Sequence, residues 1–168
     1  VLVLGLGIGA ATLVFSVVDA VVLRPLPFAH ADRLVTLWDT NPGKGLTHDP
    51  ISPVNFMDYR ALPVFEDAAV WWRPGINLED PGQDPLRVNT IEVSNNLFAL
   101  LGVTPQVGEG FPASPTLHHP DRIAVISDRL WRDRLQSRAD VLGQSLRING
   151  TPMTVVGVMP PGFAYPVT

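Results

Sequence analysis

Two adjacent histidines are the best candidate for a metal site in the sequence. His118 and His119 stand close to Asp121, and imidazole and carboxylate groups are common zinc ligands. Adjacent side chains point to opposite sides of a strand, helical zinc ligands usually stand four residues apart, and this pair is flanked by prolines. We therefore interpret the pair as part of a solvated loop and predict no metal-binding residue.

Other polar and aromatic residues are spaced poorly for catalysis. Glu79, Asp80 and Asp84 could form a carboxylate pair for glycoside hydrolysis, but they surround a Pro-Gly turn, where solvation explains them. Trp71-Trp72 could stack on a sugar or lipid, although aromatic residues in strands usually pack against neighbours. The sequence has no cysteine, no G-x-S-x-G elbow and no G-x-x-x-x-G-K-[ST] loop for a nucleoside triphosphate. We predict a chain that is not an enzyme, has no catalytic residue and binds no cofactor.

Glycines near the N-terminus allow competing interpretations. The pattern G-x-G-x-x-A at residues 5–10 follows VLVL and fits a dinucleotide-binding turn, with Asp39 as a ribose ligand. The helix after such a turn should be amphipathic, whereas residues 11–23 carry only three polar side chains. A signal peptide, with A-x-A at residues 29–31, fits less well because the apolar stretch is too long and two prolines intervene.

The N-terminal segment is typical of a membrane-spanning helix. Residues 1–18 contain no charge, and Asp19 is the only charged residue before Arg24. About 20 helical residues cross the hydrocarbon core of a bilayer. We predict that residues 1–24 form a transmembrane helix truncated at its N-terminus and that residues 25–168 form one separate domain.

Small residues recur along this helix. Gly5, Gly9, Thr12, Ser16 and Ala20 follow in steps of four, three, four and four residues, which places them on one face. Helices in lipid associate where small residues let the backbones approach. We predict that these five residues form a helix-packing stripe. The alternative is that glycine is simply tolerated, since it is common in membrane helices.

Composition and local patterns indicate an α+β domain of mixed short strands and helices. The net charge of −4 provides no basic field, so we exclude nucleic acid as a partner, and 17 prolines among 168 residues indicate many turns. The elements alternate without the regular crossovers of a doubly wound fold. Strands are expected where apolar and β-branched residues alternate or run together, at residues 33–39, 68–72, 76–78, 86–93, 122–126, 144–149 and 151–159.

Capping and turn residues place the helices and one hairpin. A helix of about ten residues is expected after Ser52-Pro53, because Val54, Met57, Asp58 and Ala61 follow at helical spacing until Pro63. Further helices are expected after Ser94 or Asn95, ending at Gly102, and after Ser127, where Leu130, Trp131 and Leu135 share a face, with a short helical turn at 139–143. The dipeptide Asn149-Gly150 predicts a type I′ hairpin.

Five motifs, taken in order, resemble a known family. They are FSVVDAVVLRPLPF (15–28), SPVNF (52–56), VSNNLFALLGVTPQVGEGF (93–111), VISDRLWRDRL (125–135) and VLGQSLRINGTPMTVVGVMPPGF (141–163). This series is similar to the MacB-like periplasmic core domain of FtsX-type ABC transporter permeases, and most similar to the orphan permeases among them. Asp19, where the family more often has asparagine, and Glu109-Gly110, in place of glycine-arginine, depart from the pattern.

The resemblance implies a location and a role. The N-terminal helix would cross a bacterial inner (cell) membrane, residues 25–168 would lie on its periplasmic or extracellular side, and three more membrane helices would follow. Such permeases work as homodimers or paired permeases with a separate cytoplasmic ATPase subunit, in transport that includes efflux. The implied function is a non-enzymatic permease subunit that transmits motion between membrane helices and an extracytoplasmic domain. The alternative is a membrane-anchored extracytoplasmic binding or sensor module without ATPase coupling.

Overall fold

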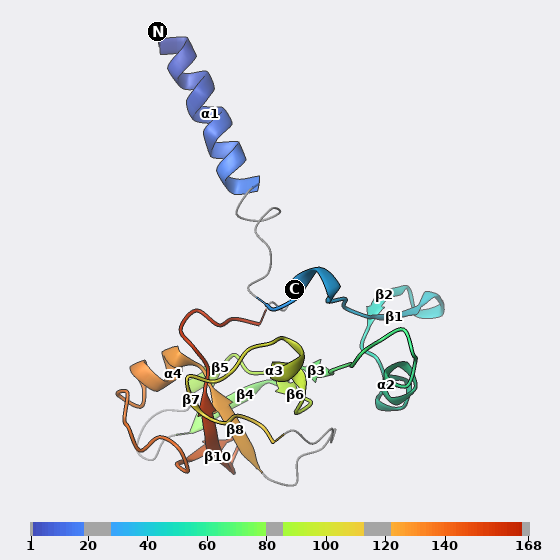
Figure 1. The fold of residues 1–168 in the computed structure, drawn as a ribbon, viewed down its shortest axis with the longest axis vertical. Coiled ribbons are helices and arrows are strands. Elements are labelled where there is room, and N and C mark those ends of the chain that lie inside the picture. The colour runs from blue at the N-terminus through green and yellow to red at the C-terminus, as the bar shows by residue number, and fades with distance from the viewer. Residues whose placement is uncertain (1, 19–27, 80–85, 113–121, 166–168) are drawn as a thin grey trace. The chain divides into compact units, whose positions relative to one another are not determined.

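The computed structural model describes residues 2–18, 28–79, 86–112 and 122–165, and the chain divides into two units, residues 1–36 and 37–168 (Figure 1). The first unit holds helix α1 (Leu2–Val18) and the 3₁₀ turn η2 (Ala31–Arg33). The described residues of the second unit include the α-helices α2 (Pro53–Arg60), α3 (Leu97–Leu100) and α4 (Asp128–Asp133), and the 3₁₀ turn η3 (Pro42–Lys44). Its strands are β1 (Asp39–Asn41), β2 (Leu46–Asp49), β3 (Trp71–Trp72), β4 (Ile76–Glu79), β5 (Leu86–Val88), β6 (Glu92–Val93), β7 (Val107–Gly108), β8 (Ile123–Ile126), β9 (Ser145–Ile148) and β10 (Thr151–Val158).

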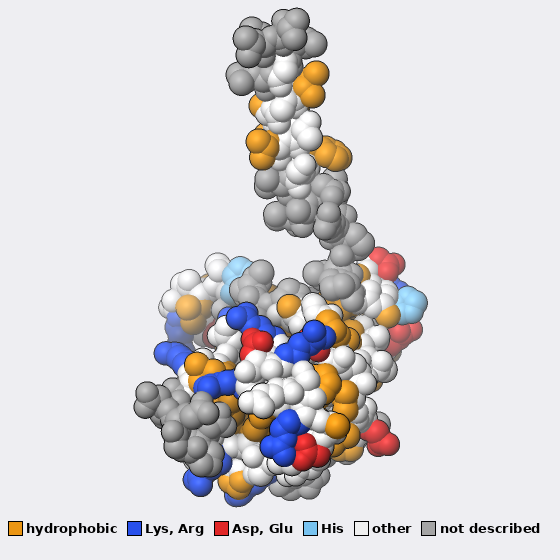
Figure 2. Space-filling model, turned by 90° about the vertical axis from the view of Figure 1, so that its left-hand side faces the viewer, with side chains coloured by type: hydrophobic (Ala, Val, Ile, Leu, Met, Phe, Trp, Pro, Cys, Tyr) orange, Lys and Arg blue, Asp and Glu red, His pale blue; other side chains and the backbone are white. Residues whose placement is uncertain are grey.

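Helix α1 is uncharged, and those of its large apolar side chains that the structure describes are exposed. Leu13, Val14 and Phe15 are between 63% and 68% exposed. Figure 2 shows only apolar and uncharged side chains on the described part of this helix, whereas charges of both signs are interspersed over the second unit. Because the helix begins at Leu2, VLVL is not a strand, and the dinucleotide-binding interpretation is wrong.

The transmembrane prediction extends beyond the residues of α1. Residues 19–27, which include Ala20 and Arg24, lie outside the described residues. Among the residues that the structure describes, no helix is both long enough and apolar enough to cross a membrane. The span predicted for residues 1–24 therefore stays a prediction.

The first predicted strand is mostly wrong. Residues 34–38 belong to no strand, and β1 begins only at Asp39, at the end of the predicted range. A strand needs a hydrogen-bonded neighbour, and in the described part of the chain β2 pairs only with β1, through Asp39 opposite Asp49 and Asn41 opposite Leu46. The alternation in RLVTLWD showed that this segment could form a strand, but in the described residues no other strand pairs with residues 34–38.

Helix α2 begins as predicted but turns a different face inward. The Ser52 hydroxyl accepts a hydrogen bond from the Asn55 backbone N–H at 3.2 Å, which is the predicted N-cap. Phe56 is only 4% exposed, whereas Val54 and Met57, whose helical spacing predicted the helix, are 71% and 52% exposed. The buried face is thus set by what α2 contacts, not by its most continuous apolar stripe.

A six-stranded sheet forms the main body of the second unit. Its strands run in the order β5-β4-β9-β10-β7, and β8 pairs with β10 in parallel. Thr154 is opposite both Ser145 of β9 and Ile123 of β8, so these two strands flank β10 on opposite edges. All other pairs in this sheet are antiparallel. Together with the short helices, this mixture confirms the mixed α and β character predicted for the domain.

Two hairpin predictions are confirmed in part or in full. Segment 76–78 pairs with the start of the strand expected over 86–93, with Ile76 opposite Val88, but that strand is divided into β5 and β6, and β6 pairs with β3 instead. The turn predicted at Asp80-Pro81-Gly82 lies outside the described residues. Asn149 and Gly150 join β9 to β10 with φ angles of +47° and +76°, the left-handed values that a type I′ turn requires at both central positions.

The core lies between this sheet and α4. Its buried cluster consists of Leu78, Ile126, Val141, Leu146, Val155 and Val158. Leu130, Trp131 and Leu135 pack against it, as their shared face predicted, and the Ser127 hydroxyl caps α4 by accepting from Leu130 N–H at 3.2 Å. The helical turn predicted at 139–143 is wrong, because this segment is a non-helical turn that places Val141 in the core.

Candidate functional site

Four residues of the predicted helix-packing stripe, Gly5, Gly9, Thr12 and Ser16, are exposed on α1, and Ala20 lies outside the described residues. The Thr12 hydroxyl donates to the Ile8 carbonyl, and the Ser16 hydroxyl donates to the Thr12 carbonyl, both at 2.8 Å. These bonds satisfy the hydroxyl donors within the helix itself. No atom lies within 4 Å of the Cβ positions that side chains at Gly5 and Gly9 would occupy, so the backbone is open to close approach. No helix packs against these residues in the described part of the chain, so the helix-packing stripe stays a prediction.

Asp39, which the dinucleotide interpretation made a ribose ligand, instead joins β1 to α2. Its Oδ2 accepts from Asn55 Nδ2 and its Oδ1 from the Tyr59 hydroxyl, each at 3.1 Å. The hydrogen bond to this carboxylate, and then its negative charge, raise the pKa of Tyr59 above its ordinary value. Because Asn55 and Tyr59 stand four residues apart, one carboxylate fixes two successive turns of the helix.

Aromatic rings connect the N-terminal and C-terminal parts of the second unit. Trp38 meets Trp71 edge to face with ring centroids 6.0 Å apart, and Trp71 meets Tyr165 in the same way at 5.8 Å. We call these three residues the aromatic series. His48 also contacts Trp38 at 5.8 Å, and burial raises the pKa of Tyr165. Trp71 thus packs as predicted, whereas its neighbour Trp72 is 43% exposed.

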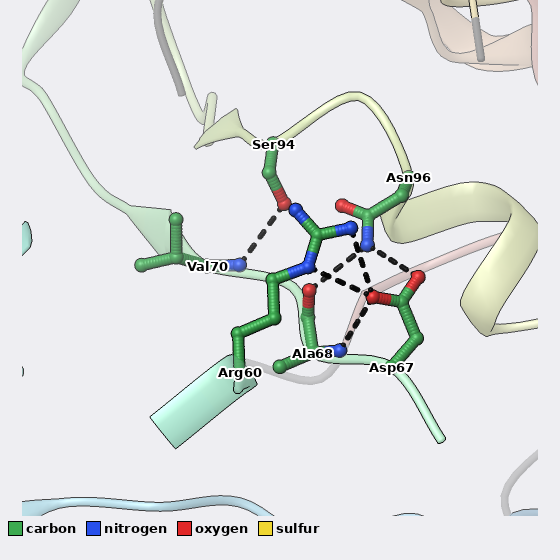
Figure 3. Close-up of polar contacts among 6 residues, drawn as sticks. All are labelled: Arg60, Asp67, Ala68, Val70, Ser94 and Asn96. Atoms are coloured by element: carbon green, nitrogen blue, oxygen red, sulfur yellow. Dashed lines mark hydrogen bonds and ion pairs between the residues drawn. The ribbon is translucent and has the colours of Figure 1, made fainter. Parts of the chain in front are cut away.

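Asp67 holds three segments of the second unit together (Figure 3). Its Oδ1 accepts from Arg60 Nε at 3.1 Å and from the Ala68 backbone N–H at 2.8 Å. Its Oδ2 accepts from Asn96 Nδ2 at 2.7 Å, and the same amide nitrogen donates to the Ala68 carbonyl at 2.9 Å. A carboxylate engaged by so many donors ties α2 to the start of α3 and is poorly placed to act as a general base.

Ser94 has a different role from the predicted one. Its hydroxyl accepts from the Val70 N–H at 3.0 Å, and its own N–H donates to the Val70 carbonyl at 2.9 Å (Figure 3). These bonds continue the pairing of β3 with β6. Helix α3 instead has Asn96 at its N-cap, without a side-chain bond, so the assignment of Ser94 or Asn95 as the cap is wrong. The predicted left-handed end at Gly102 is confirmed by its φ of +66°.

The residues considered for metal or acid–base chemistry are not brought together in the described part of the chain. Five of them lie outside the described residues: His118, His119, Asp121, Asp80 and Asp84. Glu79 forms an ion pair with Arg147, with Oε2 and Nε 3.8 Å apart. In residues 2–18, 28–79, 86–112 and 122–165, no three His, Cys, Asp or Glu residues gather as metal ligands would.

The sequence predictions missed several residues whose contacts join distant segments within the second unit. Arg60 and Asp67 lie on either side of Pro63 and meet only because the intervening chain turns back. Trp38 and Tyr165 both contact Trp71, but they are far apart in the sequence, one near each end of the segment that forms the second unit. One of these contacts could have been anticipated from the sequence. Asn55 and Tyr59 are four residues apart on the predicted helix, and polar side chains at that spacing can donate to a single acceptor.

Comparison with solved structures identifies the fold. The extracellular domain of the noncanonic ABC-type transporter YknZ from Gram-positive bacteria matches with a TM-score of 0.57 and 14% identity, over 67% of this chain and 58% of that one. The periplasmic region of MacB from Actinobacillus actinomycetemcomitans matches with a TM-score of 0.57 and 12% identity, over 73% of this chain and 56% of that one. The chain thus spans less than two thirds of either solved domain. The comparison with curated proteins yields no match.

The fold of this chain is therefore similar to the folds of these two solved domains. The family model of the MacB-like periplasmic core domain matches residues 1–166, nearly the whole chain. The chain belongs to the MacB-like periplasmic core domain family of ABC transporter permeases, which confirms the resemblance found in its motifs.

Proposed function

We propose that this chain is part of a non-enzymatic permease subunit of an ABC-type transporter. In this proposal residues 1–24 cross the membrane, and the domain that follows moves with that helix instead of moving independently. Family membership supports the transporter class, and the charge-free run from Val1 to Val18 supports the membrane helix.

The observation that carries the proposal is how the chain is held where it enters the second unit. Trp38 is packed edge-on against Trp71, and the next residue, Asp39, is bonded to Asn55 and Tyr59 of α2. Consecutive side chains of extended backbone point to opposite sides, so the entering chain is anchored on both. Force on the preceding segment is therefore received at two adjacent residues with little slack.

Further contacts give that force a route through the unit. The Arg60-Asp67-Asn96 bonds connect α2 to α3, and the aromatic series continues from Trp71 to Tyr165. These are packed or hydrogen-bonded contacts between short elements, which transmit displacement better than a flexible linker does.

The proposal also names the partners. The stripe of Gly5, Gly9, Thr12, Ser16 and Ala20 meets another membrane helix, the subunit acts as a homodimer or with a paired permease, and a cytoplasmic ATPase subunit drives the motion. The domain from residue 25 lies on the periplasmic or extracellular side of the bacterial inner (cell) membrane. After a carbonate wash, the complete chain should remain with the membrane, and residues 25–168 expressed alone should be soluble.

A flexible insertion tests the coupling. In the complete permease with its ATPase, a glycine-serine stretch after Pro27 should leave ATP hydrolysis intact but abolish transport, because such linkers absorb displacement. Hydrogen exchange of residues 37–79 should then no longer respond to ATP. The matched control is the same insertion after Gly82, which should keep both transport and the response. If the Pro27 insertion transports normally, coupling through the link is wrong. If neither the parent nor the control responds to ATP, an anchored binding or sensor module is favoured.

A further inference from the structure

The tip of the β9-β10 hairpin carries the one Asn-Gly dipeptide in the sequence, Asn149-Gly150. Both residues are exposed. In such a dipeptide the glycine nitrogen can attack the amide carbon Cγ of the asparagine, because glycine has no Cβ to obstruct the approach. The Gly150 N–H donates to no other described residue, so its nitrogen is accessible. The tip therefore holds the groups that react when an asparagine loses its amide.

In the folded chain, residues 75–77 hold Asn149 by three hydrogen bonds. Asn149 Oδ1 accepts from the Asn77 N–H at 2.9 Å, and Asn149 Nδ2 donates to the Gly75 carbonyl at 3.2 Å. The Asn149 N–H also donates to the Asn77 carbonyl at 3.0 Å. Both ends of the side-chain amide are thus engaged by backbone groups in and next to β4. Any rotation that carries Cγ onto the Gly150 nitrogen has to break the two side-chain bonds first.

We propose that Asn149 is a deamidation site and that separation of the hairpin tip from β4 limits its reaction. Only the open form, in which the amide is released, reacts as a peptide does. The observed rate is then the peptide rate multiplied by the population of the open form. Three hydrogen bonds of ordinary strength reduce this population by on the order of a hundredfold. The inference is independent of the transport function proposed above.

The reaction proceeds in two steps and consumes one water molecule. The Gly150 nitrogen forms a bond to Asn149 Cγ, the bond from Cγ to Nδ2 breaks, and the proton of the Gly150 N–H leaves with Nδ2 as ammonia. Water then opens the resulting cyclic imide. Attack of water at Cγ gives aspartate, and attack at the backbone carbonyl carbon of Asn149 gives isoaspartate, in which the main chain runs through Cγ.

Either product removes the link to β4. A carboxylate has no N–H to donate, so aspartate at this position presents an acceptor to the Gly75 carbonyl oxygen. Isoaspartate adds a backbone carbon to a turn that fits two residues, and it disrupts the pairing of Ile148 with Thr151. Deamidation therefore makes a transient opening of the hairpin tip permanent.

Mass spectrometry of the full chain during incubation at mildly alkaline pH tests the inference. Asn149 should show the mass gain that replaces NH₂ by OH, and its rate is compared with that of a peptide of residues 145–152, which has the same local sequence without β4. Hydrogen exchange of the Asn149 N–H reports the same opening independently, because this group bonds to the Asn77 carbonyl. The slowing of deamidation and the protection from exchange should agree, both on the order of a hundredfold.

Two variants of Asn77 separate protection by β4 from other effects. Asn77→Pro removes the N–H that donates to Asn149 Oδ1, and it should bring the deamidation rate toward that of the peptide. The matched control Asn77→Ala keeps this N–H, changes only an exposed side chain, and should leave the rate unchanged. If Asn77→Pro does not fold, urea below the unfolding transition should raise the deamidation rate and the exchange of the parent chain in the same proportion.

The contrary results are equally clear. A rate in the parent chain equal to that of the peptide would show that β4 does not protect Asn149. A slowing that differs by more than about tenfold from the exchange protection, or an equal acceleration by Asn77→Ala and Asn77→Pro, would show that another step limits the reaction. Deamidation of other asparagines with Asn149 intact would reject the site.

Discussion

At the scale of single residues, Asp39 determines how β1 meets α2, and its effect on Tyr59 is measurable. Asp39→Asn should lower the pKa of Tyr59 toward its ordinary value, because the amide has no charge and accepts a hydrogen bond less strongly. The chain has two tyrosines, so Tyr165→Phe leaves Tyr59 as the only phenol, and ultraviolet difference absorbance then follows its ionisation. An unmoved titration would show that the bond is absent in solution.

The same shift gives the pH dependence a sign. The pKa of Tyr59 is higher in the folded chain than in the unfolded chain, where it is about 10, so the folded state holds this proton more tightly. Its contribution to stability is complete below about pH 10 and is lost as the pH rises through the folded pKa. In the Tyr165→Phe background, stability to urea should therefore fall less steeply with alkaline pH when Asp39 is replaced by Asn.

Gly157 allows β10 to approach a neighbouring segment closely. A Cβ at this position would lie 3.2 Å from both Cα and N of Gly110, which are backbone atoms that cannot rotate away. Gly157→Ala should lower the free energy of unfolding by about 1–3 kcal/mol. The matched control is Gly75→Ala, where the nearest atom is Arg87 Nη2 at 3.8 Å, and its effect should stay within about 0.5 kcal/mol. Equal losses in urea unfolding would refute this close approach.

At the scale of elements, features decided by neighbouring residues could be predicted, and features decided by distant ones could not. The caps at Ser52 and Ser127 each involve a backbone N–H three residues away, so the sequence contained them. The buried face of α2 depends on Asp39 and Asp67, which hold the side of the helix carrying Tyr59 and Arg60. Likewise, residues 34–38 had the pattern of a strand, but pairing depends on a partner that no local pattern reveals.

Asn149 links the β9-β10 hairpin to β4, beyond its role in the turn. Its Oδ1 accepts from the Asn77 N–H at 2.9 Å, and its Nδ2 donates to the Gly75 carbonyl at 3.2 Å. Asn149→Ala should cost about 1–3 kcal/mol, because it removes both bonds and disfavours the φ of +47°. Asn149→Gly should recover about 1 kcal/mol by accepting that φ without restoring the bonds. Equal unfolding free energies for the two variants would rule out the conformational part.

The helix-packing stripe makes a prediction for α1. Replacing Gly5 and Gly9 by leucine should weaken self-association in a membrane reporter by on the order of 1 kcal/mol, about fivefold, because leucine keeps the backbones apart. Gly7→Leu is the control, because Gly7 lies off the stripe and no atom stands within 4 Å of its Cβ position. An unchanged signal for the double variant, or an equal loss for Gly7→Leu, would show that the stripe is not the packing face.

At the scale of the whole molecule, family motifs predicted more than local chemistry did. Motifs such as VISDRLWRDRL identified the family because they combine a strand, a cap and a helix in one short segment, and the structure forms all three. The anchoring of Trp38 and Asp39 was not predicted, because its partners Trp71 and Tyr59 are brought close only by the tertiary fold.

The central claim is that displacement of the N-terminal helix reaches the second unit undiminished, and a distance measurement tests it most directly. Because the chain has no cysteine, spin labels can be placed at Leu13→Cys on α1 and at the exposed Ser145→Cys on β9. Double electron–electron resonance would be recorded in the complete permease with its ATPase, after dilution with unlabelled subunits. We predict one narrow distance distribution that ATP leaves unchanged and that the glycine-serine insertion after Pro27 broadens. A broad distribution in the parent protein, or a distance that changes with ATP, would contradict the account.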